Sequence, residues 1–556
     1  MSLGPCGERD AKRTSLRRGS TILPESLALL HIANSYNDKL PRTPLCHSLT
    51  RNYRVFPAPS TLFFMSSAKT IAKNTAWLLI ATTGQKLLAF LAFAIAARLV
   101  GPTVTGEYFF SVAVTSTFVI LADLGMTPVV IRSIASGKKE GKRLFGAALR
   151  LKFLLIPVAI LASFIFIGIR NVNEVIIVTT AIMTLVMSAD SIHLVFYGAL
   201  RGSQQLRFEA MGMFIGQALS AITAVSAAIL GWGAPGLALA LLMGSVWNVG
   251  WSWAKAARQG VLPEVPKKGD LASLARQAVP FALAGIFVKI YSYLDTLTIQ
   301  YFHGEKAVGD YSVAYKSTYA FQFIPLVFIA ALYPAMSSVF AKNDKAELQK
   351  VFAGSLRIMA IVAAPIAAGL SAIAPQFVTM IYGHSFLGSV AALTVLPWVL
   401  LPIFIDFPVG SLLNASHRAH LKTTAMGGAM IVNAVLNFLL VPLMGPVGAA
   451  WAAVVSFWFL LFAGICFCWK MLPSVSWFFW LLARALASGA AVWFAVRMFG
   501  KPMPFPLIIL FGAAVAGVAL LATKLLTIQE LRNMVRWLAA KVRGNMQDEE
   551  ELHEEV

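Results

Sequence analysis

Charged residues are scarce in this sequence, and their scarcity excludes an ordinary soluble fold. Only 13% of the 556 residues are Asp, Glu, Lys or Arg, whereas 58% are hydrophobic and the mean hydropathy is +0.73. Soluble domains carry roughly 25% charged residues. A soluble core could not bury that much apolar surface, so the chain is expected to lie in a membrane.

Cysteines and nucleotide-binding motifs are equally sparse. Cys6 and Cys46 lie in the polar start of the chain, while Cys466 and Cys468 lack the partner pair that a zinc or disulfide site needs. The sequence has no Gly-x-x-x-x-Gly-Lys-[Ser/Thr] loop, so ATP hydrolysis is not expected. We therefore predict no metal and no cofactor.

Long apolar runs recur from residue 75 onward. Because lipid offers no partner to a free backbone group, each run should be a helix. The sequence predicts an all-α, polytopic membrane protein of about fourteen transmembrane helices, since about 20 apolar residues span the hydrocarbon. The connections leave no room for a soluble catalytic domain. The predicted spans are 76–97, 108–130, 149–169, 174–197, 210–231, 235–254, 278–301, 311–334, 354–374, 389–413, 424–441, 447–468, 476–497 and 504–526.

The net charge of +21 is divided unevenly between the predicted loops. With the N-terminus inside, the inward loops carry 21 Lys and Arg, and the outward loops carry five. This positive-inside asymmetry predicts that both termini are cytoplasmic. The basic charge is thereby explained by topology, and no nucleic-acid partner is expected.

An eight-residue pattern occurs twice in the chain. Gly101-Pro-Thr-Val-Thr-Gly-Glu-Tyr108 returns as Gly304-Glu-Lys-Ala-Val-Gly-Asp-Tyr311, at an offset of 203 residues. Each copy follows the first span of a unit of six predicted spans, an even number, so both units enter the membrane in the same direction. A pseudo-two-fold axis along the membrane normal should relate them, with the transport path between the two lobes.

The repeat and the two chain ends predict five regions. A disordered cytoplasmic tail (1–67), for which Met65 is an alternative start, precedes two parallel six-helix repeats, the N-lobe (68–260) and the C-lobe (261–470). Two extra helices (471–527) follow. The last region (528–556) has an amphipathic pattern over 528–543, typical of a helix on an anionic leaflet, and then an acidic tail.

Several short motifs resemble one family. Their order and spacing, from about residue 68 to 525, are similar to the polysaccharide flippases (Wzx-type) of the multidrug/oligosaccharidyl-lipid/polysaccharide exporter superfamily. They include the two copies of Gly-x-x-x-x-Gly-[Glu/Asp]-Tyr, Ala122-Asp-Leu-Gly125, Leu332-Tyr-Pro-Ala-Met-Ser337 and Asn437-Phe-Leu-Leu-Val-Pro442.

This resemblance implies a secondary transporter and no enzyme. It implies two six-helix lobes with two extra helices, and a substrate of undecaprenyl-pyrophosphate-linked oligosaccharide for exopolysaccharide, O-antigen or capsule. The expected place is the bacterial inner membrane, with membrane lipids around the chain and a polymerase and glycosyltransferases as partners. Many relatives carry arginines in the cavity, whereas the embedded cations here are mainly lysines.

Three lysines within predicted spans are candidate substrate-binding cations: Lys86, Lys289 and Lys316. Lys86 and Lys289 are 203 residues apart, so the repeat makes them symmetry equivalents. A buried ammonium costs several kcal/mol unless it faces water or a partner, and a cation-lined cleft suits a pyrophosphate. Alternatively, each lysine pairs with an aspartate or extends to the membrane surface.

Acidic residues and one histidine within spans are candidates for ion coupling. Asp190 and His193 lie three residues apart on one helix face, which suits a proton relay or, alternatively, a hydrogen bond in the bundle. The other candidates are Asp123, Asp295 and Asp406. Coupling to a proton or sodium gradient would follow from any of them.

Two rival functions remain open at the level of the sequence. A drug–cation antiporter of the same superfamily would share the helix plan but would favour an acidic cavity. An integral-membrane polysaccharide polymerase or lipid glycosyltransferase would need a large outward loop or a clustered acid motif. The largest predicted outward loop, 375–388, offers only His384.

Overall fold

The computed structural model describes the backbone of residues 61–137, 140–500, 503–530, 532–533 and 536, with side chains from Thr82 onward except at 280 and 284. The predicted disordered tail, Cys6, Cys46 and the acidic end of the chain lie outside these residues, as does most of the predicted amphipathic helix. The chain divides into Met1–Phe64 and Met65–Val556, and the second unit is described below.

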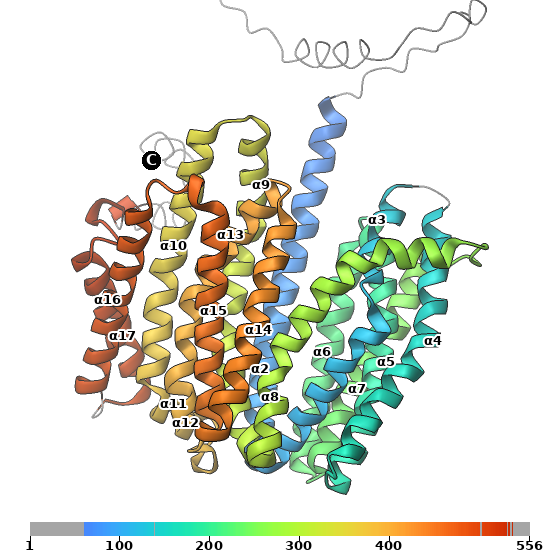
Figure 1. Ribbon diagram of the computed structural model, residues 1–556, viewed down its shortest axis with the longest axis horizontal. Helices are drawn as coiled ribbons and strands as arrows, with labels where there is room; N and C mark the ends of the chain where they lie inside the picture. Colours follow the sequence, from blue (N-terminus) through green and yellow to red (C-terminus); the bar gives the residue numbers. More distant parts are fainter. Residues whose placement is uncertain (1–60, 138–139, 501–502, 531, 534–535, 537–556) are drawn as a thin grey trace, which may run out of the picture. The chain divides into compact units, whose positions relative to one another are not determined.

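The described residues form helices and no strand, which confirms the predicted all-α membrane fold (Figure 1). Within the part of the chain that the structure describes, twelve helical segments are long and apolar enough to cross a membrane. The α-helices are α2 (Thr61–Asp123), α3 (Met126–Ala135), α4 (Glu140–Ile169), α5 (Glu174–Gly202), α6 (Leu206–Ile229), α7 (Gly233–Arg258), α8 (Asp270–Tyr319), α9 (Phe323–Ala341), α10 (Lys345–Ala372), α11 (Ala374–Ile381), α12 (Ser389–Val395), α13 (Leu400–Ala415), α14 (Ala419–Met444), α15 (Pro446–Cys468), α16 (Val475–Phe499) and α17 (Phe505–Ala522). Short 3-10 turns are η1 (Ala320–Gln322), η2 (His384–Phe386), η3 (Leu396–Val399) and η4 (Trp469–Met471).

Two of the membrane helices are broken at equivalent glycines of the repeat. Gly101 in α2 has φ 80° and ψ 177°, and Gly304 in α8 has φ 75° and ψ −171°. Glycine adopts a positive φ without steric cost, so it permits the break. Each of α2 and α8 therefore holds two helical segments where the sequence predicts two spans. The count of fourteen depends on treating these segments separately and stays a prediction.

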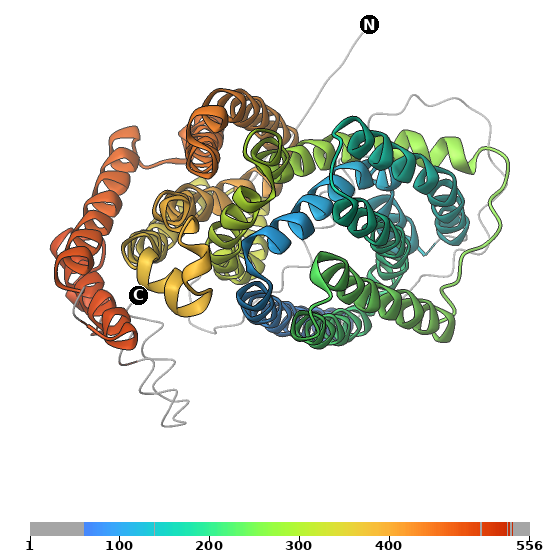
Figure 2. The ribbon, with the colours of Figure 1, turned by 90° about the horizontal axis from the view of Figure 1, so that it is seen from below.

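The helices pack in two groups, with α8 between them. One group contains α3 to α7, and the other contains α9 to α15; α16 and α17 pack beside α10. Seen from below, α8 in green runs from the blue and teal helices to the yellow and orange ones (Figure 2). The arrangement agrees with two repeats and two added helices, while the exact lobe boundaries, 68–260 and 261–470, stay predictions.

Small residues allow close helix packing within the first group. A Cβ at Gly244 of α7 would lie 2.6 Å from the carbonyl oxygen of Gly216 on α6 and would overlap the Ser220 hydroxyl. Because lipid is as apolar as the helices, membrane helices associate through such close backbone contact rather than through hydrophobic burial.

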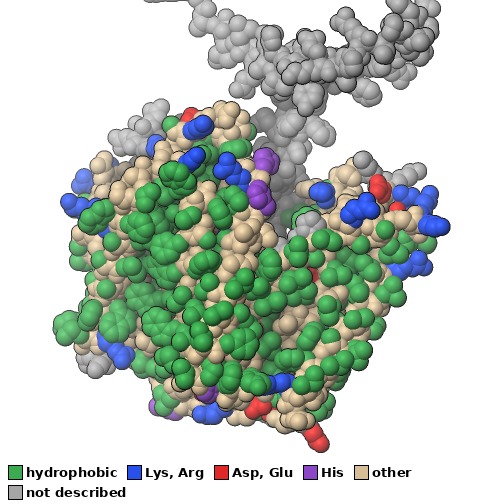
Figure 3. Space-filling model, in the orientation of Figure 1, with side chains coloured by type: hydrophobic (Ala, Val, Ile, Leu, Met, Phe, Trp, Pro, Cys, Tyr) green, Lys and Arg blue, Asp and Glu red, His purple; other side chains and the backbone are tan. Residues whose placement is uncertain are grey.

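The surface separates apolar and basic side chains. Hydrophobic side chains cover the middle of the face seen in Figure 3, and most Lys and Arg lie toward its upper end. Large apolar residues such as Leu154 and Leu510 have 64% and 66% of their surface exposed. This distribution is expected where lipid surrounds the middle of the molecule and water meets its ends.

Candidate functional site

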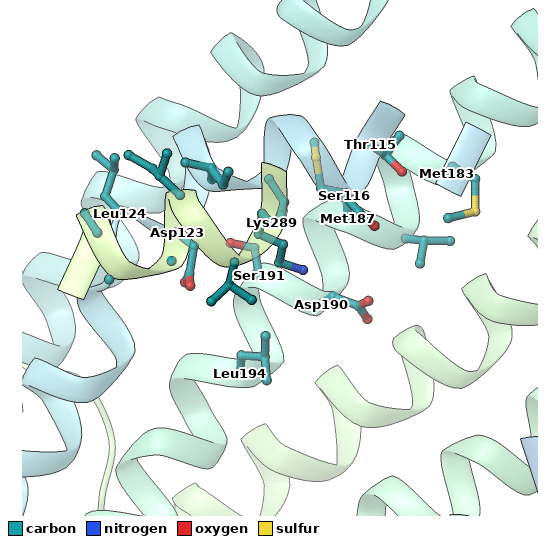
Figure 4. A pocket seen from close by; sticks show the side chains of 18 residues that line it. Thr115, Ser116, Asp123, Leu124, Met183, Met187, Asp190, Ser191, Leu194 and Lys289 are labelled. Carbon is teal, nitrogen blue, oxygen red and sulfur yellow. The ribbon is translucent and has the colours of Figure 1, made fainter. Parts of the chain in front are cut away.

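A cavity of about 400 Å³ lies between α2, α5 and the first part of α8. Lys289 extends from α8 into the space that Asp123, Asp190 and Ser191 line (Figure 4). Three of the predicted site residues therefore meet in one cavity, although they come from three distant parts of the sequence.

Behind this cavity lies Lys152, a lysine that the sequence analysis missed. Its side chain is 0% exposed, its Nζ lies 2.6 Å from Asp123 Oδ1, and it donates a hydrogen bond to Ser191 Oγ at 2.8 Å. The count of 21 inward Lys and Arg includes Lys152, although the predicted span 149–169 already contains this residue. Because α4 begins at Glu140, Lys152 lies about three turns inside the helix and not in a loop. The apolar residues Leu151 and Phe153 on either side were the available signal.

Asp190 is held from the opposite side of the cavity. Its Oδ1 accepts a hydrogen bond from Ser245 Oγ at 2.6 Å and lies 3.0 Å from His193 Nε2. The spacing of three residues does bring Asp190 and His193 together, while the proton relay itself stays a prediction. Lys152 pairs with Asp123, and Ser245 and His193 contact Asp190. The cavity therefore contains both acidic and basic side chains and is not uniformly cationic.

Lys86 and Lys316 form a second cationic cluster, from α2 and α8. The two ammonium groups lie near enough for their charges to repel each other, and Lys316 Nζ lies 5.3 Å from the centre of the Phe109 ring. Both lysines are exposed. Among the described ion pairs neither lysine has a carboxylate, since Asp123 pairs with Lys152 and Asp406 with Lys422.

The lysine positions depart from the symmetry that the repeat predicts. Lys86 is not among the residues that line the cavity with Lys289. The counterpart of Lys316 in the first repeat is Ala113, so the second cluster has no symmetric copy. A symmetric anion site made of Lys86 and Lys289 therefore stays a prediction.

Another pocket, of about 360 Å³, lies among α8, α13 and α14. Asp295 and Asp406 both line it, together with Tyr291, Tyr315 and Tyr319. The Asp295 carboxylate accepts hydrogen bonds from the Tyr311 hydroxyl at 2.7 Å and from Asn437 Nδ2 at 2.8 Å. Within the described residues, no group of three His, Cys, Asp or Glu side chains could hold a metal ion.

The two copies of the repeated motif touch each other, backbone to backbone. A Cβ at Gly106 would overlap the Glu305 carbonyl oxygen, and a Cβ at Gly309 would overlap that of Pro102. Because Gly106 and Gly309 are repeat equivalents, as are Pro102 and Glu305, the contact is reciprocal. We call it the glycine contact; sequence reasoning noted the repeated glycines but not that they meet.

Two arginines join the lobes near the glycine contact. Arg98 of α2 donates to the carbonyl oxygens of Met380 and Ile381 in α11. Arg170, between α4 and α5, donates to Gln300 Oε1 at 2.8 Å and lies 4.0 Å from the centre of the Tyr301 ring. Tyr301 is the repeat counterpart of Arg98, so these contacts also follow the pseudo-two-fold relation.

Comparison with known proteins shows which families the chain is similar to. Residues 71–340 match the family described as "Polysaccharide biosynthesis protein", and residues 280–439 match the family "MatE". The chain is similar to "Probable low-salt glycan biosynthesis flippase Agl15" of Haloferax volcanii, at 24% identity over 70% of this chain and 81% of that protein. "Teichuronic acid biosynthesis protein TuaB" of Bacillus subtilis is 28% identical over 29% of this chain and 34% of its own length.

These matches support the resemblance to the polysaccharide-flippase branch of the multidrug/oligosaccharidyl-lipid/polysaccharide exporter superfamily. Solved structures of the superfamily share the fold of this chain. The lipid II flippase MurJ superposes with a TM-score of 0.66 at 13% identity, over 80% of this chain and 98% of MurJ. An inward-facing multidrug resistance MATE transporter superposes with a TM-score of 0.59 at 17% identity, over 69% of this chain and 95% of that one.

The comparisons support the predicted class of protein. The relatives are named as flippases and transporters, which supports a multi-pass membrane transporter of glycan biosynthesis rather than an enzyme. The resemblance predicted from short motifs is thereby confirmed.

Proposed function

We propose that this transporter flips undecaprenyl-pyrophosphate-linked oligosaccharide repeat units across the bacterial inner membrane, for exopolysaccharide, O-antigen or capsule. The observation that carries the proposal is the pair Lys86 and Lys316. Two neighbouring ammonium groups that have no carboxylate partner among the described residues repel each other, and an anion between them removes that repulsion.

The pyrophosphate is the part of such a substrate that most resists entry into the membrane. Lys86 and Lys316 replace the water around its phosphates while the lipid tail stays in the bilayer. Lys289, across from Asp123 and Asp190, adds a third cation whose charge is partly balanced. Tyr315 and Tyr319, with ring centres 4.3 Å apart, offer aromatic faces on which sugars stack.

Transport requires that the lobes separate at one end and approach at the other. The glycine contact and the two arginine contacts hold the lobes together at one end, so we propose that this end opens when the substrate is released. With both termini cytoplasmic, that end faces outward. A proton or sodium gradient acting through Asp123, Asp190, His193, Asp295 or Asp406 would drive the cycle.

The cation pair can be tested by export measurements in cells. The double variant Lys86→Gln/Lys316→Gln should lose export, and lipid-linked oligosaccharide should accumulate on the cytoplasmic side at normal membrane abundance. Lys350→Gln, an exposed lysine of α10, is the matched control and should export normally. Wild-type export from the double variant would reject the proposal, and accumulation of a drug instead of a glycan lipid would favour the antiporter.

A further inference from the structure

A pocket of about 520 Å³ lies apart from the transport cavities, between α10, the start of α16 and the residues after α17. Three basic side chains, two hydroxyls and two indole rings converge there. They are Arg357, Arg484, Lys524, Ser474, Ser476, Trp477 and Trp480.

One of the three cations is already neutralised. The Arg357 guanidinium bonds both Glu530 carboxylate oxygens, at 2.8 and 3.0 Å, and donates from Nε to the Leu525 carbonyl oxygen at 3.0 Å. Burial alone raises the pKa of Glu530, but hydrogen bonds from Thr527 and the charge of Arg357 outweigh it and leave this pKa below its usual value. Glu530 is therefore ionised at neutral pH and occupies Arg357.

The other two cations are available to a ligand. Arg484 has a single described contact, with its guanidinium 6.0 Å from the centre of the Trp480 ring, and Lys524 has no described carboxylate partner. Both side chains are exposed. Ser474 caps the 25-residue helix α16 by accepting from the Trp477 backbone N–H at 3.0 Å, so the positive end of the helix dipole faces the same pocket.

The surroundings of the pocket identify the kind of anion. Trp480 is 64% exposed and Phe479 next to it is 55% exposed, so apolar side chains continue from the pocket along the outer face of α16. Tryptophan is enriched at the level of lipid headgroups. The helix α16 begins at the upper end of Figure 1, and in the same orientation most Lys and Arg gather at that end (Figure 3).

We propose that this pocket binds the phosphate headgroup of an anionic phospholipid from the cytoplasmic leaflet, with the acyl chains along α16. Arg484 and Lys524 contact the phosphate, Ser474 and Ser476 donate hydrogen bonds, and Trp480 packs at the glycerol level. Only the assignment to the cytoplasmic leaflet rests on the predicted topology. The site would secure the two added helices, α16 and α17, in the membrane, a role separate from transport.

The test uses the purified full chain in neutral detergent, titrated with phosphatidylglycerol and followed by native mass spectrometry. Each Lys or Arg at a charged membrane surface contributes about 1 kcal/mol, so Arg484→Gln/Lys524→Gln should bind this lipid roughly thirtyfold more weakly. Lys342→Gln/Lys345→Gln removes the same charge from exposed positions outside the pocket and should bind as the wild type does.

Four results would overturn the proposal. The pocket variant could keep wild-type affinity, or the wild type could bind phosphatidylcholine equally well. Phosphatidylglycerol could bind only after the chain is shortened to end at Arg543, which would make the acidic tail the occupant. Finally, the pocket variant could lose glycan export with its lipid binding intact, which would assign the pocket to the transported substrate. Retained export with weakened lipid binding supports the proposal whether or not Lys86 and Lys316 bind pyrophosphate.

Discussion

At the scale of single residues, the Lys152–Asp123 ion pair is unequal in its exposure to water. Lys152 is 0% exposed, whereas 38% of the Asp123 side chain faces the cavity. A buried charge left without its partner costs about 3–5 kcal/mol, while a carboxylate that reaches water loses much less. The stability of the pair should therefore depend on which partner is removed.

We predict that Asp123→Asn destabilises the protein by about 3–5 kcal/mol, since it strands the Lys152 ammonium in the interior. Lys152→Met should cost less, and the double variant Asp123→Asn/Lys152→Met should regain most of the loss. Thermal unfolding in detergent measures all three. Equal losses for the two single variants would show that exposure of Asp123 does not matter.

The roles of the candidate lysines can be distinguished by substitutions that remove the charge or keep it on a side chain of another shape. Lys86→Ala should lower export at least about tenfold, corresponding to ~1.4 kcal/mol, and Lys86→Arg should retain more because the charge survives. Lys289→Ala should have a smaller effect, because Asp123 and Asp190 share its cavity. Export is measured per amount of protein in the membrane. If Lys289→Ala lowers export more than Lys86→Ala does, the anion site lies in the mixed-charge cavity with Lys289 and not at Lys86.

At the scale of helices, the glycine contact leaves no space for an added side chain. A methyl group at Gly106 or Gly309 would overlap a carbonyl oxygen of the other lobe. We predict that Gly106→Ala or Gly309→Ala pushes this end open. Spin labels at the exposed, repeat-equivalent positions Thr103 and Lys306, in a chain with its four cysteines replaced, should report a longer distance in either variant.

Gly250→Ala provides the matched control for the glycine variants. Gly250 lies inside α7, and a Cβ there would meet nothing within 4 Å. In the Gly250→Ala variant, the distance between the labels at Thr103 and Lys306 should equal the distance in the chain that keeps all its glycines. If Gly106→Ala leaves the distance unchanged, the two motifs do not hold this end closed.

The helices themselves were predictable, but their breaks and pairings were less so. Apolar runs of about 20 residues fix the presence of membrane helices. They do not fix a mid-run break: the predicted span 389–413 is divided into α12, η3 and α13, because Pro397 removes a backbone donor in η3. Lys152 lies within both the predicted span 149–169 and α4, but its partner Asp123 comes from another helix, and hydropathy does not reveal such a pairing.

The site shows the same limit. Spacing along one helix brought Asp190 and His193 together as predicted, because helical geometry is local. The neighbours of Lys86, Lys289 and Asp123 come from other helices, and the repeat alone does not specify packing between them. The symmetry of the glycine contact is present in the sequence, whereas the asymmetry of Lys316 and Ala113 depends on one substitution between the repeats.

At the scale of the whole molecule, the first region should be dispensable. Residues 1–64 show no apolar periodicity, and Met65 is followed directly by the first predicted span. A chain that begins at Met65 should therefore complement a strain lacking the transporter. Loss of export at normal membrane abundance of the shortened chain would contradict this.

The orientation of the molecule in the membrane determines which side each proposed site faces. The basic loops predict that Gly304 and the glycine contact face outward, while Asn343 between α9 and α10 faces the cytoplasm. Alkaline phosphatase fused at Gly304 should be active and the same fusion at Asn343 inactive, with a cytoplasmic fluorescent reporter giving the opposite pattern. Because α8 is broken at Gly304, the pair of fusions also tests whether the part of α8 after this glycine crosses the membrane together with α9. Activity at both positions would mean that α8 and α9 do not return the chain to the cytoplasm, and the assignment of the lipid pocket to the cytoplasmic leaflet would then lose its support.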